Sequence, residues 1–396
     1  CKVKDRFMIF YGDVLLDMDL ASFIKFDSNG SSIATIVVHP NDHPFDSDLV
    51  EINNECIVTA FHPKPHDKNN YYRNLVNAAV YIFSPDVFKY IPHGEPSDFG
   101  RDIFPLLLKN KDVIRAYRTA EYIKDMGTID RLQSASDDYL SGKVERFSKR
   151  HKRPAIFLDR DGTLIRDVDF LCRTEDLEPF SFLSASIKKI NDSDHLCFLI
   201  TNQPVVARNF CDIDTVKQIH NKLEILLGKE GAYINDIYFC PHHPDRGYPE
   251  ENPAFKIDCN CRKPKTEMID RAVKEYNVDT ENSWFVGDTT TDIQTGINAR
   301  LKTILVRTGK GGKDGKFNCS PDFVFDDSEA AIDFILTDRY KYIPYVNRIV
   351  DTIKHTQFPF VISVGGLARS GKSTFIQILT KHIVKKGGTC QVVQID

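Results

Sequence analysis

Two aspartates, Asp159 and Asp161, have a type and spacing that suit metal binding or acid–base chemistry. They follow the apolar run 155–158, which we predict to be a buried strand, and a glycine and a threonine come directly after them. Carboxylates at the end of a parallel strand point into the crevice where α/β sheets bind ligands. Two of them can share a Mg²⁺, or act as a nucleophile and a general acid/base. Taken alone, the stretch is also compatible with a turn capped by aspartates.

Three more polar clusters occur further along the chain, two of them directly after strand-like runs. A hydroxyl and amides suit phosphoryl oxygens, cations offset phosphate charge, and another carboxylate can complete a metal site. Each cluster alone is typical of an ordinary surface loop, so the argument depends on their order. They consist of Thr201, Asn202 and Gln203, then Arg262 and Lys263, and finally Asp288.

Three of the ten cysteines crowd beside a histidine pair. A C-x-H pair, Cys240 and His242, is followed by a C-x-C pair, Cys259 and Cys261, and together they can form a closed Cys₃His zinc site of the structural kind. The residues between the pairs are rich in proline and predict a loop that a metal would hold in place. Free thiols in an ordinary loop are the alternative. The other cysteines are too sparse for a disulfide scaffold, so we expect a reducing, cytosolic compartment.

The elements that must position these residues alternate between strand and helix, which is typical of βαβ units and a parallel sheet. We expect an α/β multidomain protein with four segments: an N-terminal α/β domain over 1–147, a central domain over 152–336, a linker helix over 337–357 and a third block over 358–396. The polar stretch 141–154 predicts a solvated linker. The central domain contains predicted strands at 155–158, 196–200, 236–239, 284–286 and 303–306, with helices at 214–229, 266–276 and 292–299.

Taken in order, the polar clusters of residues 154–336 resemble the motifs of the haloacid dehalogenase (HAD) superfamily of phosphohydrolases. The resemblance implies a Rossmann-like parallel sheet in the centre of the chain. It implies that Asp159 attacks phosphorus to form an aspartyl-phosphate, and that Asp161 protonates the leaving alkoxide and then activates water. Thr201 and Lys263 would hold the transferring oxygens. Asp288 would complete a catalytic Mg²⁺ site with Asp159 and the backbone carbonyl of Asp161.

The combination of D-R-D-G-T, C-P-H-H-P and C-x-C-R-K-P narrows the resemblance to the D-glycero-D-manno-heptose 1,7-bisphosphate 7-phosphatases. This implies a Mg²⁺-dependent hydrolase with a structural Zn²⁺, in which Asn202, Gln203 and Arg262 contact a sugar phosphate. Pro204 and Val205 stand where the family usually has a Ser-Gly pair, so we expect a different backbone there. The alternatives are a histidinol-phosphate phosphatase, a polynucleotide kinase 3′-phosphatase-like end-repair enzyme, and a catalytically dead scaffold.

The N-terminal block resembles the carboxyl-terminal two thirds of a sugar-phosphate nucleotidyltransferase, at Gly12-Asp13, Lys64-Pro65 and the D-M-G-T stretch that begins with Asp125. The resemblance implies that Asp13 and Asp125 hold a Mg²⁺ between nucleotide and sugar phosphates, and that Lys64 contacts the sugar phosphate. The chain begins after the family's glycine-rich nucleotide loop. We therefore expect a truncated domain, from a longer polypeptide, whose transfer activity is incomplete.

Residues 366–373 match the phosphate-loop pattern G-x-x-x-x-G-K-S between a predicted strand, 360–364, and a predicted helix, 373–386. The loop would be shaped by Gly366 and Gly371, Lys372 would reach the β- and γ-phosphates of ATP, and Ser373 would ligate Mg²⁺. The block resembles the start of a P-loop kinase of the uridine kinase type. We expect its kinase activity to be incomplete.

Composition excludes several classes of protein for this chain of 396 residues. A hydrophobic fraction of 41% and a charged fraction of 27% argue against disorder and low complexity. The net charge of −4 argues against a broad cationic surface for nucleic acid or anionic lipid, and so against the end-repair alternative. No apolar run is long enough to cross a membrane and no signal peptide opens the chain. We therefore expect a cytoplasmic, multifunctional enzyme of carbohydrate metabolism that binds a small sugar phosphate, with no nucleic acid or membrane partner.

Overall fold

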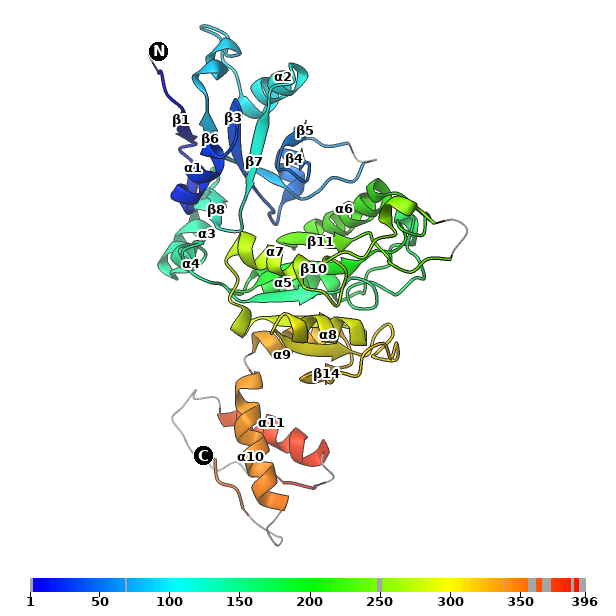
Figure 1. Ribbon diagram of the computed structural model, residues 1–396. Helices are drawn as coiled ribbons and strands as arrows, with labels where there is room; N and C mark the ends of the chain where they lie inside the picture. The colour runs from blue at the N-terminus through cyan, green and yellow to red at the C-terminus, as the bar shows by residue number, and fades with distance from the viewer. Residues whose placement is uncertain are drawn as a thin grey trace. The chain divides into compact units, whose positions relative to one another are not determined.

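The computed structural model describes residues 3–67, 70–247, 251–337, 339–354, 361–364, 372–385 and 388–391 (Figure 1). The chain divides into two compact units, Cys1–Glu329 and Ala330–Asp396. The first unit contains an N-terminal mixed sheet, a small two-stranded sheet and a central parallel sheet. The predicted α/β multidomain class is therefore confirmed for the first unit.

The N-terminal sheet has the strand order β5-β4-β6-β3-β7, with β1 paired to β6. Its core is rich in stacked aromatic rings, among them Phe83 and Phe104, which are fully buried. The strands are β1 (Phe7–Phe10), β3 (Ala34–His39), β4 (Leu49–Ile52), β5 (Val58–His62), β6 (Val76–Phe83) and β7 (Ile114–Arg118). The separate pair is β2 (Val14–Asp17) with β8 (Tyr122–Asp125), and the helices are α1 (Leu20–Ser28), α2 (Phe104–Lys109), α3 (Ile129–Leu140) and α4 (Lys143–Arg146).

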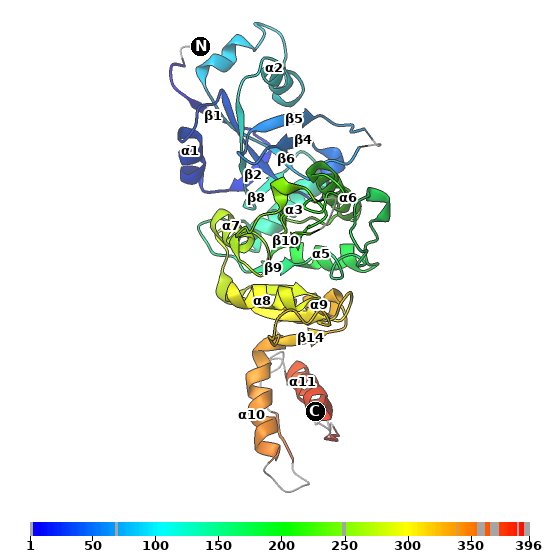
Figure 2. The ribbon, with the colours of Figure 1, turned by 45° about the vertical axis from the view of Figure 1, so that its right-hand side comes forward.

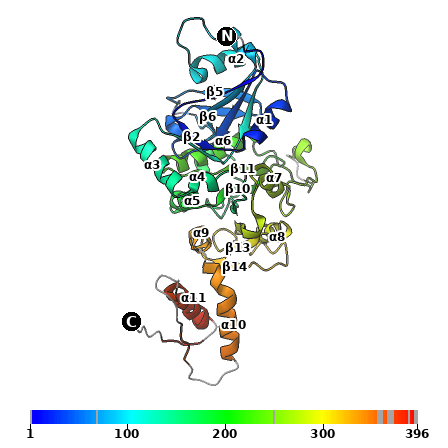
Figure 3. The same ribbon diagram turned by 90° about the vertical axis from the view of Figure 1, so that its left-hand side faces the viewer.

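The central sheet is parallel throughout, with the strand order β11-β10-β9-β12-β13-β14. All four residues of β9 are buried, because helices α5, α6, α7 and α8 cover the faces of this sheet (Figures 2 and 3). The strands are β9 (Ala155–Leu158), β10 (Leu196–Asn202), β11 (Asp236–Cys240), β12 (Trp284–Gly287), β13 (Lys302–Val306) and β14 (Phe323–Phe325). The helices are α5 (Leu183–Asn191), α6 (Ile213–Lys229), α7 (Glu267–Tyr276) and α8 (Thr290–Asn298).

The order of these strands decides where a ligand can bind. The chain first builds the sheet outward from β9 through β10 to β11, and then returns to place β12 on the other side of β9. A crevice forms outside the carboxyl ends of the strands at such a reversal. The predicted Rossmann-like arrangement is confirmed, and the ends of β9, β10 and β12 meet at one point.

The predicted solvated linker over 141–154 is wrong. The segment contains α4, and the side chains of Val144 and Phe147 are each 7% exposed because they pack against Tyr122 of β8. The guanidinium of Arg153 lies 3.6 Å from the centre of the Phe147 ring. The polar composition of the segment gave no indication that Val144 and Phe147 are buried and attach it to the N-terminal part.

In the second unit, α10 (Ile343–Lys354) and α11 (Lys372–Lys385) pack through Val346, Val350 and Leu379, and α9 (Ser328–Leu336) spans the division between the units. The helix predicted over 337–357 is thus a short 3₁₀ turn, Arg339–Tyr342, followed by α10. Residues 361–364, which belong to the strand predicted over 360–364, have no regular secondary structure. Gly366 and Gly371 lie outside the described residues, and Lys372 and Ser373 begin α11.

Among the helices of the described residues, none is both long enough and apolar enough to cross a membrane.

Candidate active site

Asp159 and Asp288 meet because they follow β9 and β12, which are neighbours in the central sheet. Lys263 lies between the carboxylates of Asp159 and Asp292. Its Nζ donates to Asp159 Oδ1 at 2.7 Å, to Asp292 Oδ1 at 2.6 Å and to the carbonyl of Ile200 at 3.0 Å. All of these charged side chains are buried. The arrangement is a buried lysine held between two carboxylates at the carboxyl end of the sheet.

The three carboxylates fit a divalent cation. Ligand oxygens of Asp159, Asp288 and Asp292 lie within 4.8 Å of one another. Asp288 Oδ1 is buried and has no hydrogen-bond partner among the described residues. Burial, together with the charge of Asp292, raises the pKa of Asp159 to about 7 even though Lys263 opposes the rise, and burial with both neighbouring carboxylates raises the pKa of Asp288 to about 8. Three hard oxygen donors with excess negative charge match the preference of Mg²⁺.

The side chain of Asp161 does not join this carboxylate group. Its two oxygens accept hydrogen bonds from the guanidinium of Arg160 at 2.9 and 3.0 Å, and Gln203 Nε2 donates to Asp161 Oδ2 at 2.9 Å. Gln203 also donates to the hydroxyl of Thr201, at 2.9 Å. Asp161, Thr201 and Gln203 therefore form one hydrogen-bonded network beside the predicted nucleophile.

Asn202 is held by the loop that carries the lysine. Its Nδ2 donates to the carbonyl of Lys263 at 3.2 Å, and its Oδ1 accepts from the backbone N–H of Lys263 at 3.0 Å. Both ends of the amide are used in this way. The structure thus places Asn202 as a clamp on the backbone of Lys263, whereas the sequence predicted a substrate contact.

Four sulfur and nitrogen ligands converge at the end of β11. They belong to Cys240, His242, Cys259 and Cys261, and all four ligand atoms lie within 4.8 Å of one another. Cys261 Sγ lies 3.2 Å from each of the other two sulfurs and 3.3 Å from His242 Nδ1. Hydrogen bonds from Cys240, Cys259 and His242 lower the pKa of the Cys261 thiol to about 5. Thiolate and imidazole donors in this number fit a structural Zn²⁺.

Arg262 directly follows Cys261 of this four-ligand cluster and precedes Lys263, and its Nη1 donates to the carbonyl of His242 at 2.9 Å. A cavity of about 560 Å³ opens over the carboxylates. Outside the carboxylate cluster its lining includes four cations, Arg262, Lys265, Lys310 and Lys316, and four aspartates, Asp167, Asp169, Asp245 and Asp258. A volume of this size with several cations in its lining can take a small molecule that bears phosphate groups.

Comparison with known proteins adds three observations. A HAD-hydrolase-like family model matches residues 260–331. A D-glycero-D-manno-heptose-1,7-bisphosphate 7-phosphatase from Thermosynechococcus vestitus is 35% identical over 192 residues, which cover 47% of this chain and 96% of that protein. The D-glycero-beta-D-manno-heptose-1,7-bisphosphate 7-phosphatase of Haemophilus ducreyi is 32% identical over 197 residues, which cover 49% of this chain and 99% of that protein.

The chain belongs to the heptose 1,7-bisphosphate phosphatase family. It is therefore a HAD-type phosphoric monoester hydrolase, as the order of its motifs predicts. A solved relative of this family, the D,D-heptose 1,7-bisphosphate phosphatase from B. bronchiseptica complexed with magnesium and phosphate, is 29% identical, covers 47% of this chain and superposes with a TM-score of 0.42.

The phosphatase of this family is joined here to a second kind of domain, because a nucleotidyl transferase family model matches residues 2–142. The predicted Asp13 and Asp125 come together because Asp13 directly precedes β2 and Asp125 ends the paired strand β8. Lys64 Nζ donates to Asp46 at 2.9 Å, and Arg131 bridges Asp46, at 2.9 Å, and Asp125, at 3.0 Å. The N-terminal resemblance is confirmed at the level of the domain.

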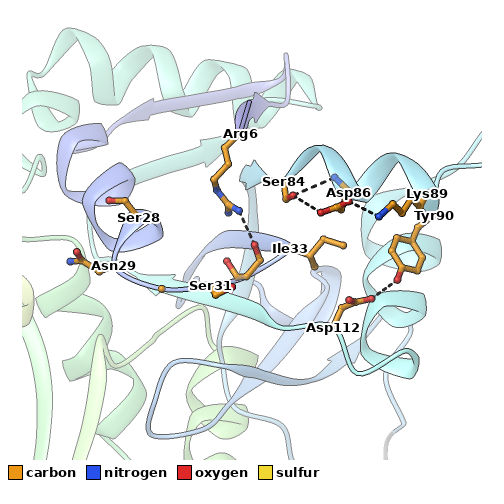
Figure 4. A pocket seen from close by; sticks show the side chains of 12 residues that line it. Arg6, Ser28, Asn29, Ser31, Ile33, Ser84, Asp86, Lys89, Tyr90 and Asp112 are labelled. Atoms are coloured by element: carbon orange, nitrogen blue, oxygen red, sulfur yellow. Dashed lines mark hydrogen bonds and ion pairs between the residues drawn. The ribbon is translucent and has the colours of Figure 1, made fainter. Parts of the chain in front are cut away.

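A second hollow of about 720 Å³ lies in the N-terminal part, at the edge of the mixed sheet (Figure 4). Its charged side chains are paired with one another: Arg6 with Asp27, and Lys89 with Asp86. None of the predicted catalytic, substrate-binding or metal-binding residues lines it. We assign it no function.

Sequence reasoning assigned no role to three residues of the site. Asp292 is the second carboxylate of the cluster that begins with Asp288, so the sequence already indicates a pair of acidic residues there. Arg160 stands between the two aspartates of the first motif. His220 accepts from Arg160 Nη1 at 3.1 Å but is 60 residues away along the chain, so no local pattern indicates it.

Proposed function

We propose that this chain is a Mg²⁺-dependent phosphatase that removes the 7-phosphate of D-glycero-D-manno-heptose 1,7-bisphosphate. The observation that carries the proposal is the buried Lys263 between Asp159 and Asp292, next to the unpartnered Asp288 oxygen, on the floor of a cavity. The activity of the relatives supplies the substrate class.

Asp159 is the proposed nucleophile. One of its carboxylate oxygens forms a bond to phosphorus while the bond from phosphorus to the C7 oxygen breaks, and Asp161 gives its proton to that oxygen. Water then attacks phosphorus, Asp161 takes the water's proton, and the bond between Asp159 and phosphorus breaks to release inorganic phosphate. Thr201 and Lys263 would hold the phosphoryl oxygens during both transfers.

Mg²⁺ would be held by Asp159 and Asp288, with the backbone carbonyl of Asp161, and would supply positive charge against the dianionic phosphate. We propose that Zn²⁺ at the four-ligand site is structural. It would shape the loop that ends in Arg262, which would contact the second phosphate of the substrate.

We also propose that the phosphatase, over 152–336, works within a multifunctional protein of heptose nucleotide synthesis, because a nucleotidyl transferase model matches the block before it. Asp13 and Asp125 would hold a second Mg²⁺, and Lys64 would contact a sugar phosphate. The segment boundaries at 1–147, 337–357 and 358–396 and the ATP-binding phosphate loop remain predictions from the sequence.

Phosphate release by the full chain in the presence of Mg²⁺ tests the phosphatase proposal. The substrates are both anomers of the heptose bisphosphate, histidinol phosphate and a 3′-phosphorylated DNA end. We expect the heptose bisphosphate to be preferred and Asp159→Asn to reduce kcat by at least about 10³-fold. Asp214→Asn, an exposed aspartate on α6, is the matched control that should keep full activity. Preference for histidinol phosphate or for the DNA end would overturn the assignment.

A further inference from the structure

The carboxylate of Asp161 is held by the neighbouring arginine and by the amide of Gln203, which donates to Asp161 Oδ2 at 2.9 Å. Arg160 Nε and Nη2 both donate to Asp161 Oδ1, at 3.1 and 2.9 Å, and Nη2 also reaches Oδ2 at 3.0 Å. The Arg160 side chain is 1% exposed, whereas that of Asp161 is 25% exposed and lines the cavity. A buried guanidinium therefore fixes a carboxylate that faces the substrate.

The guanidinium is itself fixed from two further sides. Arg160 Nη2 donates to Gln203 Oε1 at 2.8 Å, and Nη1 lies 3.1 Å from His220 Nε2. An arginine side chain can only donate, so His220 Nε2 must accept and the proton of the ring must be on Nδ1. Burial, and then the positive charges of Arg160 and Arg73, lower the pKa of His220 well below its usual value, which keeps the ring neutral.

His220 has no packing reason to be a histidine. It lies on the inward face of α6 among Val216, Ile219 and Leu223, all of them fully buried, and its ring contacts Phe239 edge to face at 5.3 Å. An apolar ring would fill the same space. A polar atom buried in such surroundings requires a hydrogen-bond partner, and the partner here is the arginine that holds Asp161.

We propose that His220 and Arg160 are positioning residues for the proton transfers of Asp161. Neutral His220 accepts from Nη1 and Gln203 accepts from Nη2, which together fix the plane of the guanidinium. Nε and Nη2 then set the orientation of the Asp161 carboxylate. Arginine is flexible, with a rotamer entropy of about 2 kcal/mol, so an unanchored guanidinium would leave that carboxylate in several orientations. The inference rests on the proposed function, since it assigns a role within the same reaction.

The test compares two substrates that differ in one atom. The first is the heptose 1,7-bisphosphate, whose alkoxide needs a proton to leave. The second is its analogue with sulfur in place of the bridging oxygen at C7, whose thiolate leaves without one. The quantity measured is kcat/KM, which covers the steps up to transfer of the phosphoryl group to Asp159 and excludes the later hydrolysis.

His220→Phe keeps the shape of the ring but removes the acceptor, and His220→Gln is the conservative variant that retains one. We expect His220→Phe to lower kcat/KM for the oxygen substrate about 10- to 100-fold and to change it less than about threefold for the sulfur analogue, a loss confined to general acid catalysis. His220→Gln should restore most of the loss. Arg160→Lys, which keeps the charge but loses the planar fork, should behave like His220→Phe.

Equal losses on both substrates, or none on either, would overturn the inference, because a structural role would affect both leaving groups alike. If His220→Phe does not fold, as judged by its thermal unfolding, Arg160→Lys gives the same comparison. Failure of the unmodified chain to hydrolyse the heptose bisphosphate would instead reject the proposed function, so the two failures can be told apart.

Discussion

At the scale of single residues, the site is a cluster of buried charges in which the negative charges outnumber the positive. Asp159, Asp288 and Asp292 face one lysine, Lys263, and among the described residues no other cation forms an ion pair with this group. Like charges at short range, away from water, favour the protonated carboxyl form. The protonation of these carboxylates must therefore depend on pH and on a bound cation.

Magnesium should stabilise the folded chain more strongly at high pH. The pKa values of Asp159 and Asp288 are about 7 and about 8 in the folded chain, and near 4 when unfolded. Between pH 4 and 8 the folded chain thus binds more protons, so this contribution to the free energy of unfolding falls as pH rises. Mg²⁺ binds the ionised form. We expect it to raise Tm by about 3 °C more at pH 8 than at pH 5.

Thermal unfolding with and without Mg²⁺ at the two pH values measures this difference. Asp288→Asn, which removes the carboxylate with the unpartnered oxygen, should reduce the increase in Tm at pH 8. An equal increase in Tm at both pH values, or a larger one at pH 5, would show that these carboxylates do not bind the ion.

At the scale of elements, the segment between β11 and α7 contains the proposed zinc ligands that follow β11. Of its described residues, only Pro253–Phe255 form a helical turn. Long irregular segments inside a compact domain are uncommon unless they have a function or are held by other contacts. Cys240 and His242 lie at the start of this segment, and Cys259 and Cys261 lie near its end. Arg262 follows the last of them.

Cys259→Ser should release zinc and weaken substrate binding. We expect zinc measured by elemental analysis to fall from about one ion per chain to near zero, since three remaining ligands no longer close the site. KM should rise about tenfold, the size expected when the charged contact from Arg262 is displaced. Cys56→Ser, in the N-terminal sheet, is the control and should change neither quantity. Full zinc content in Cys259→Ser would contradict this assignment of the ligands.

At the scale of the whole first unit, the nucleotidyltransferase-like part is attached to the phosphatase part through a buried carboxylate. Asp236, at the start of β11, accepts from Arg118 Nη1 at 2.5 Å, from Arg73 and from the hydroxyl of Tyr276 at 3.1 Å. Although burial opposes it, the two arginines hold the pKa of Asp236 below its usual value. The two parts therefore share a charged contact, in which Arg73 and Arg118 of the N-terminal part pair with the buried Asp236.

Arg118→Met should lower the free energy of unfolding of the full chain by about 3 kcal/mol, because it leaves Asp236 buried with only one cation. Denaturation in urea measures the change. Arg101→Met removes an arginine that is 71% exposed and should cost less than about 0.5 kcal/mol. Similar small losses for both variants would mean that this contact does not contribute to stability.

Prediction from sequence succeeded for the central sheet and its strand ends. The strands predicted at 196–200 and 284–286 were observed as β10 and β12, each extended by one or two residues. It failed over 141–154, where Val144 and Phe147 bury a segment of polar composition. It also missed the short strands β2, β4, β5 and β8 of the N-terminal part, because each mixes polar or charged residues with apolar ones, whereas the equally short β9 is apolar throughout.

The sequence by itself determined the ligand types, the motif order and the alternation of strand and helix, because these depend on residues close together in the chain. It therefore identified the family and the candidate nucleophile. The tertiary structure decided which side chains meet. Lys263 reaches Asp159 across 104 positions because the crossover between β11 and β12 returns the chain to the end of β9. His220 reaches Arg160 across 60 positions because α6, in the crossover between β10 and β11, packs beside the end of β9. Such contacts depend on the path of the whole chain, which no local pattern contains.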